Sequence, residues 1–336
     1  MSFLTLVQHR ASQIIWRFVC PALVAVTSIY LVACAAPIVN DDQSRATFKQ
    51  RCADPNVVRC FGFEIGELST QGGPISWSAY AETVGTFANG LENGSDLTGR
   101  VELATDQKAS GESSLKFFMP SRTGAGFAGQ FYANFSDDFS VQFGEGEEFY
   151  VQWRQRFSRD FLKNRYLPRS NWKQAVIGEG NRPGKPAWSC TQLELVVNQD
   201  DFGFPAMYHS CGGKDDQYEP IYQKWSVSYE PDQWMTFQLH VKVGTWYKND
   251  RKYHKDSFIE LWVAQEGKPS RVVVSEKYDL ANNNPIAKYG KIWLLPYLTR
   301  KDATQLHPNA YTWYDELVIS TAPIADPVSF PLSDTG

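Results

Sequence analysis

Arginine, lysine, histidine, amide and aromatic side chains occur at every second position in several segments of this sequence. Aromatic rings stack on the faces of sugar rings, and Arg, Lys and amide groups hold carboxylates through hydrogen bonds. The pattern therefore indicates a surface for an acidic carbohydrate, although an ordinary solvated sheet face alternates in the same way. The residues concerned are Gln152, Arg154, Arg156, Gln192, Glu194, Gln238, His240, Lys242, Glu260, Trp262, Lys291, Trp293 and Tyr297.

The intervening positions of these segments are apolar. Within residues 148–158, Val151, Trp153 and Phe157 alternate with polar side chains, and the same alternation occurs in residues 191–198, 236–244, 260–264 and 291–297. Successive Cβ atoms of a strand point to opposite faces, so each segment is predicted to be a strand with one apolar and one polar face. We expect the polar faces to form one surface.

The rest of the chain also has the character of β structure. From residue 59 onward, short alternating runs are separated by clusters of Gly, Pro, Asn and Asp. No segment predicts a long amphipathic helix, and no fixed repeat occurs. We therefore predict an all-β protein with a single domain over residues 51–330. Residues 52–147 are expected to supply its opening strands, and a small separate domain over these residues is the alternative.

Composition limits the possible partners. The 336 residues are 43% hydrophobic, which suits a buried core, and 33 Lys and Arg against 37 Asp and Glu leave a net charge of −4. This balance lacks the basic surface that phosphate backbones require, so nucleic acid is excluded as a partner. We expect a monomer.

The N-terminus predicts export. Residues 18–33 are 16 residues without a charge, too short for a comfortable membrane span, and residues 31–34 (LVAC) resemble the bacterial lipobox. We predict a signal peptide over 1–33, lipidation of Cys34 and a flexible tether over 34–50. The protein would then be a lipoprotein of the outer membrane, the cell surface or the periplasm, with membrane contact through the lipid alone. An ordinary cleaved signal is the alternative.

Four cysteines remain after the signal peptide and Cys34. They are Cys52, Cys60, Cys190 and Cys211, an even number that suits disulfides in an oxidising compartment. Three pairings are possible, and Cys52–Cys60 with Cys190–Cys211 is favoured because each closes a short loop.

The sequence predicts no required cofactor. Neither a CxxC spacing nor a nearby His pair supports zinc. Calcium is possible at acidic loops 134–138, 198–201 and 214–216, which supply oxygen ligands but carry no specific loop signature.

The order of segments over residues 148–321 resembles that of jelly-roll polysaccharide lyases and related concanavalin A-like sandwiches. The alginate-lyase branch of that family carries R-x-E-L-R, Q-I/V-H and Y-F-K-x-G-x-Y-x-Q strands. Residues 192–195 (QLEL), 207–209 (MYH) and 289–297 (YGKIWLLPY) resemble these strands in turn. The resemblance implies a β-jelly-roll of two antiparallel sheets, with a polysaccharide groove on the concave sheet. It also implies that His209 and Tyr297 are catalytic, and it places Gln192 where the family has its first Arg.

Elimination from a uronate needs a group that neutralises the C5 carboxylate, a base for the C5 proton and an acid for the leaving oxygen. Arg154, Gln192 or Lys242 could hold the carboxylate, His209 or Tyr297 could act as the base, and Tyr297 could act as the acid. A tyrosine becomes a base only when nearby cations favour its phenolate. Candidate cations are Arg154, Lys242 and Lys291.

The predicted substrate-binding residues are Arg154, Arg156, Glu194, His240, Lys242, Lys291 and Trp293. Because residues 192–195 and 289–297 depart from the family's motifs, glucuronan-like or sulfated uronic polymers are expected as substrates rather than alginate.

Two other functions fit the same pattern. In a non-catalytic carbohydrate-binding or adhesion protein, Trp262, Trp293, Tyr297 and Trp313 would be stacking platforms. A glycoside hydrolase would need two carboxylates about 5–9.5 Å apart. The sequence supplies acidic residues but lacks the E-x-D-x-x-E strand of laminarinase-like hydrolases.

Overall fold

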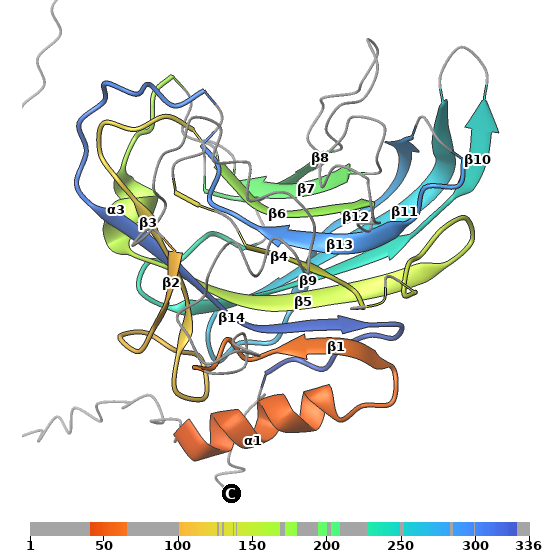
Figure 1. Ribbon diagram of the computed structural model, residues 1–336, viewed down its shortest axis with the longest axis horizontal. Helices are drawn as coiled ribbons and strands as arrows, with labels where there is room; N and C mark the ends of the chain where they lie inside the picture. The colour runs from red at the N-terminus through yellow and green to blue at the C-terminus, as the bar shows by residue number, and fades with distance from the viewer. Residues whose placement is uncertain are drawn as a thin grey trace, which may run out of the picture. The chain divides into compact units, whose positions relative to one another are not determined.

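In the computed structural model, the described part of the chain forms fourteen strands and two helices (Figure 1). The structure describes residues 41–65, 101–125, 128–129, 131–136, 138, 140–168, 172–179, 194–199, 203–208, 227–248, 252–282, 285–298 and 300–327. These residues all belong to one of the two structural units of the chain, Val39–Gly336. No helix in these ranges is long and apolar enough to cross a membrane.

The larger sheet, sheet A, has the strand order β10-β11-β9-β5-β14-β3-β2, with β1 paired to β14 and β12 paired to β11. All of its pairings are antiparallel. Its strands are β1 (Val57–Phe61), β2 (Val101–Ala104), β3 (Ser114–Met119), β5 (Glu148–Phe157), β9 (Trp234–Lys242), β10 (Thr245–Lys248), β11 (Lys252–Ala264), β12 (Arg271–Ala281) and β14 (Ala310–Ser320).

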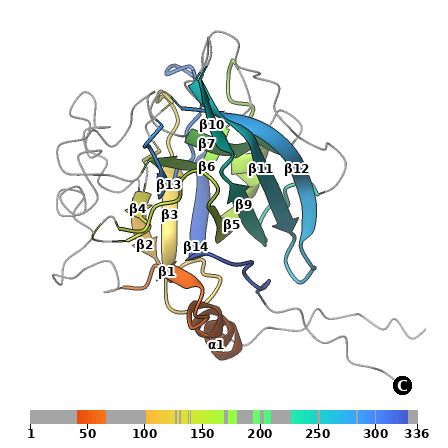
Figure 2. The same ribbon diagram turned by 90° about the vertical axis from the view of Figure 1, so that its right-hand side faces the viewer.

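The smaller sheet, sheet B, has the order β4-β13-β6-β7-β8 and is also antiparallel. Its strands are β4 (Phe131–Asn134), β6 (Trp172–Glu179), β7 (Glu194–Gln199), β8 (Pro205–Tyr208) and β13 (Tyr289–Leu294). In Figure 1, sheet B lies above β5, β9 and β14 of sheet A, and Figure 2 shows the two layers from the side. The prediction of an all-β protein with two antiparallel sheets is confirmed.

The apolar alternation of the strands explains how the two sheets pack. In β5 the apolar residues Phe149, Val151, Trp153 and Phe157 are fully buried, and they belong to one cluster with Ile292 and other residues of sheet B. Fully burying a side chain of this size contributes on the order of 2 kcal/mol. The alternate residues Gln152, Arg154 and Arg156 therefore lie on the outer face of sheet A, the face turned away from sheet B.

A buried amide cluster joins the two sheets inside this core. The Gln174 side chain of β6 donates to Gln155 of β5 over 3.2 Å and accepts from the hydroxyl of Tyr229. Gln155 in turn donates to the hydroxyl of Thr312 in β14 over 3.0 Å, and the Tyr314 hydroxyl donates to the Gln174 carbonyl over 2.9 Å. Because a buried polar group is costly without a partner, these bonds favour a single register between the sheets.

Helix α1 (Asp41–Cys52) corrects the predicted tether over 34–50, because residues 41–50 are helical. The Phe48 side chain packs in a small cluster with Val318 of β14 and Ile324. Figure 1 shows α1 below β1, on the opposite side of sheet A from sheet B. The segment has little helical amphipathicity, so its helix depends on tertiary contacts that the sequence pattern does not show.

The disulfide Cys52–Cys60 is present and joins the end of α1 to β1. This part of the cysteine prediction is confirmed. Cys190 and Cys211, the predicted signal peptide and Cys34 lie outside the described residues, so their roles stay predictions.

Candidate functional site

The sandwich has two polar outer faces, one on each sheet, and the predicted site residues are divided between them. Lys291 and Trp293 belong to β13 of sheet B, whereas Arg154, Arg156, His240 and Lys242 belong to β5 and β9 of sheet A. The hydrophobic core lies between the two sheets. The expectation of one shared polar surface is therefore corrected: a substrate on sheet B cannot contact these four residues of sheet A.

On the outer face of sheet B, β13 and β6 place a lysine beside a tryptophan. Ile292 and Leu294 of β13 belong to the core, so Lys291 and Trp293 point to the opposite face. The Lys291 Nζ atom lies 4.5 Å from the centroid of the Trp293 ring. Both side chains are buried, with 0% and 3% of their surface exposed. These two buried side chains therefore pack beneath the outer surface of sheet B and expose little area to a ligand.

The accessible part of this face is beyond the end of β13, at Tyr297 and Lys173. The Lys173 backbone N–H donates to the Tyr297 carbonyl over 2.9 Å, which extends the pairing of β6 past β13. The Lys173 Nζ lies 5.3 Å from the centroid of the Tyr297 ring, and both side chains are half-exposed. The ammonium therefore lies over the face of the ring, in a cation–π contact. The pair combines a proton-transfer group with a cation.

Sequence reasoning identified Tyr297 but missed Lys173. The signal was present, because Lys173 is a polar residue two positions before the apolar run 175–177 (AVI). An irregularity between Lys173 and Ala175 changes the pairing of β6 with β7 at this point. Simple two-residue alternation therefore fails there, and it could not place Lys173 under Tyr297.

Of three other predicted residues, the structure places only the backbone of Glu194. Glu194 begins β7 and pairs with Gly178 of β6, which itself pairs with Lys291. The Glu194 backbone thus lies in the same row of sheet B as Lys291. His209 and Gln192 lie outside the described residues, so their catalytic roles stay predictions.

On the outer face of sheet A, His240 lies between two carboxylates. Its Nδ1 is 3.0 Å from Glu260 and its Nε2 is 3.1 Å from Glu148, while its ring stacks on Tyr150 with a centroid distance of 4.2 Å. Both ring nitrogens therefore face carboxylate oxygens, which accept hydrogen bonds. His240 therefore links β5, β9 and β11 and has a structural role. Lys242 lies exposed on the same strand.

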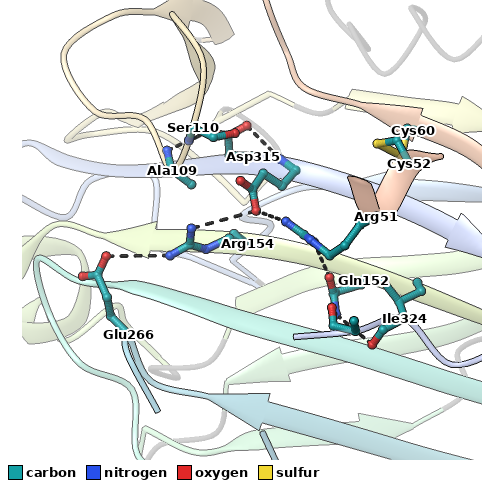
Figure 3. A network of polar contacts seen from close by, with 12 residues as sticks. Arg51, Cys52, Cys60, Ala109, Ser110, Gln152, Arg154, Glu266, Asp315 and Ile324 are labelled. Atoms are coloured by element: carbon teal, nitrogen blue, oxygen red, sulfur yellow. Dashed lines mark hydrogen bonds and ion pairs between the residues drawn. A yellow bond between two sulfur atoms is a disulfide. The ribbon is translucent and has the colours of Figure 1, made fainter. Parts of the chain in front are cut away.

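Arg154 belongs to a charged network under α1 (Figure 3). Its guanidinium lies 3.9 Å from Glu316 and 3.7 Å from Glu266. Arg51 of α1 donates to Glu316 and to Gln152, and burial lowers the pKa of Arg51. Sequence reasoning missed Arg51 because its partners are 101 and 265 residues away.

Arg156, half-exposed in the same sheet, pairs in register with Trp313 and Trp234.

Asp315, next to Glu316, is fully buried. Its carboxylate accepts from the backbone N–H groups of Ala109 (2.7 Å) and Ser110 (3.3 Å), so it joins the β2–β3 connection to β14. Burial and the adjacent Glu316 carboxylate raise the pKa of Asp315 well above its usual range. Asp315 therefore has a structural role, because it holds residues 109 and 110 against β14.

This raised pKa predicts a pH effect on stability. The native state holds the Asp315 proton more tightly than the unfolded chain, so stability falls as the pH rises from about 3.9, the ordinary value, through the raised value. Asp315→Asn cannot titrate, and its amide oxygen still accepts from Ala109. In urea unfolding between about pH 4 and pH 8, we expect the variant to gain stability relative to the wild type as the pH rises.

Asp302→Asn is the matched control. Hydrogen bonds from Thr304 lower the pKa of Asp302, so this carboxylate is ionised in both the folded and the unfolded state above about pH 5, and its contribution to stability changes only at lower pH. Across the measured range we therefore expect an almost constant difference in stability between Asp302→Asn and the wild type. A difference between Asp315→Asn and wild type that stays constant across the range would contradict the assignment.

Metal ligands do not converge in the described ranges, where no group of three or more His, Cys, Asp or Glu side chains is placed to hold a metal ion. In the loop near residue 138, the Ser140 N–H and hydroxyl both donate to Asp138 and lower its pKa to about 2. The other two acidic loops named above extend outside the described residues, and a calcium requirement stays a prediction.

Comparison with known proteins supports the fold. No family model and no curated protein matches the chain in sequence. The structure is similar to that of the marine alginate lyase of Aplysia kurodai, with a TM-score of 0.50 and 12% identity over 66% of this chain and 87% of that one. The endo-β-1,4-glucuronan lyase of the fungus Trichoderma reesei matches with a TM-score of 0.43 and 16% identity over 66% and 87% of the two chains. The likeness to the Aplysia enzyme confirms the predicted β-jelly-roll fold.

Proposed function

We propose that this protein is a polysaccharide lyase that cleaves a uronate-containing polysaccharide by β-elimination at the outer face of sheet B. The observation that carries the proposal is the half-exposed pair of Tyr297 and Lys173, with the Lys173 ammonium 5.3 Å from the phenol ring. The jelly-roll fold, which this chain shares with the Aplysia alginate lyase, supports the same reaction class.

In this reaction the Tyr297 phenolate takes the proton from C5 of the uronate. The C5 electron pair forms the C4–C5 double bond, the C4–O bond breaks, and the new Tyr297 hydroxyl returns its proton to the leaving oxygen. Lys173 stabilises the negative charge on the phenolate and on the substrate carboxylate. His209 and Gln192 stay proposed partners in these steps. The proton is taken from the substrate and returned to it, so the reaction needs no redox partner and no outside proton.

The burial of Trp293 and Trp313 argues against a purely adhesive protein, although the third proposed tryptophan platform, Trp262 of β11 in sheet A, is only half-buried. Stacking on a sugar requires an exposed ring face. Trp293 and Trp313 are only 3% and 6% exposed, and the Trp313 N–H donates to Asp106 over 3.1 Å. Of the proposed platforms on sheet B, Tyr297 alone is half-exposed within the described part of the chain.

We also propose that the protein works outside the cytoplasm, held by a lipid at Cys34. The support is the Cys52–Cys60 disulfide, since such bonds persist in oxidising compartments.

The proposal is tested by incubating the purified full-length chain with alginate, glucuronan, pectate, heparinoid and ulvan. The ultraviolet absorbance of unsaturated uronate ends is followed for each polymer. We expect a rise on at least one of them. No rise on any polymer, together with retardation on a polysaccharide gel, would overturn the lyase and leave a binding protein.

A further inference from the structure

Three connecting segments meet at the end of the sandwich beyond Tyr297. They are the residues after β3, the region of helix α3 (Arg159–Lys163) with the residues that follow it, and the connection from β13 to β14. Gln305 holds them together: its carbonyl accepts from the Arg122 N–H (2.9 Å), and its side-chain Nε2 donates to the Arg165 carbonyl (2.6 Å). The backbones of Arg122 and Arg165 are therefore both hydrogen-bonded to Gln305.

This end of the sandwich is continuous with the candidate site. Leu298, directly after Tyr297, donates its backbone N–H to the Ala125 carbonyl over 3.2 Å, and Lys301 donates its backbone N–H to Leu298 over 3.2 Å. In Figure 1 the connection from β13 to β14 (blue) and the residues after β3 (yellow) rise at the left beyond the level of β13. A chain bound at Tyr297 would extend onto these segments.

The segments are strongly basic. Residues 121–125, 158–168 and 298–308 contain six Lys and Arg against two Asp. Four of the cations are exposed and make no ion pair with any described residue, unlike Arg159, which pairs with Asp232 at 3.4 Å. We call these four the cationic rim: Arg122, Lys163, Arg165 and Arg300.

Two rim residues are held in an uncommon backbone conformation. Arg122 has φ 55° and Arg300 has φ 59°, in the left-handed region that favours glycine. Such conformations cost free energy and persist where the surrounding structure imposes them. Here the Arg122 N–H bonds to the Gln305 carbonyl, and the N–H of Lys301, next to Arg300, bonds to the Leu298 carbonyl, so backbone hydrogen bonds hold the chain at or beside both residues.

We propose that the cationic rim binds the acidic polysaccharide beyond the sugar that reacts at Tyr297, as an inference that rests on the proposed function. A polyuronate carries a carboxylate on each acidic sugar, and unpaired guanidinium groups hold carboxylates through paired hydrogen bonds. Leu167 and Leu306 are also exposed here, at 49% and 67%, which would suit an anionic lipid surface. Continuity with Tyr297 favours the polysaccharide.

The test compares the wild type with Arg122→Gln/Arg165→Gln/Arg300→Gln in the full-length chain. The substrates are a long polyuronate that the wild type cleaves and its tetrasaccharide. Each exposed charge contributes modestly, so we expect the KM for the polymer to rise about tenfold relative to that for the tetrasaccharide, with less dependence on salt. The control Lys248→Gln/Lys255→Gln/Lys277→Gln removes three exposed lysines of β10, β11 and β12 and should change neither KM.

Gel retardation on uncleaved polyuronate separates this inference from the lyase proposal. Retardation that is lost in the rim variant but kept in the control supports the rim even if no polymer is cleaved. Equal retardation and an equal KM ratio in rim variant and wild type would overturn it. So would a rim variant that keeps polymer binding but no longer binds vesicles of phosphatidylglycerol and phosphatidylcholine.

Discussion

Tyr297→Phe is expected to lower the rate of elimination by about 10²–10⁴-fold, the range typical of losing a positioned acid or base. The ring and its contact with Lys173 stay in place, so only the hydroxyl is lost. Polymer binding should therefore persist while kcat falls. The measurement is the rate at which unsaturated ends appear, on the polymer that the wild type cleaves best.

The chain offers a matched control on the other sheet. Tyr311 of β14 also lies beneath a lysine, with Lys116 Nζ 5.0 Å from its ring centroid, but on the outer face of sheet A. Tyr311→Phe should leave the rate unchanged, and Lys116→Met should do so as well, whereas Lys173→Met should slow the reaction. Equal rates for Tyr297→Phe and Tyr311→Phe would remove Tyr297 from the mechanism.

Arg51→Met is expected to destabilise the protein by about 3–5 kcal/mol, because it leaves the buried Glu316 carboxylate without its closest partner. The Glu316 and Arg51 side chains are 1% and 5% exposed, so water cannot replace the lost contact. Arg154, 3.9 Å from Glu316, compensates only in part. Urea unfolding of variant and wild type measures the loss.

The double variant Arg51→Met/Glu316→Gln separates charge from packing. It removes both members of the buried pair, so we expect it to recover part of the stability lost in Arg51→Met. The Cys52–Cys60 disulfide still joins α1 to β1 in both variants, so the comparison is made with the helix attached. A double variant less stable than Arg51→Met would show that the helix is held by packing of Phe48 and not by the ion pair.

Two-residue alternation predicted the strands well because it reports a local property. Val151, Trp153 and Phe157 all point into the core as expected, and so do Phe237, Leu239 and Val241 of β9. A strand buries one face whatever its neighbours are, so burial follows from the order of residues along a single strand. Helix α1 was not predicted, since its contacts come from distant strands.

The sequence by itself determined the all-β class and the direction of most side chains relative to the core. It also favoured the Cys52–Cys60 pairing and identified Tyr297 as a candidate for proton transfer. Only the tertiary structure decided which sheet each strand joins. It separated Arg154 and His240 from Tyr297, and it placed Lys173 and the cationic rim beside Tyr297. The physical reason is that alternation specifies the inner and outer faces of a strand, whereas the choice of sheet depends on hydrogen bonds between segments far apart in the chain.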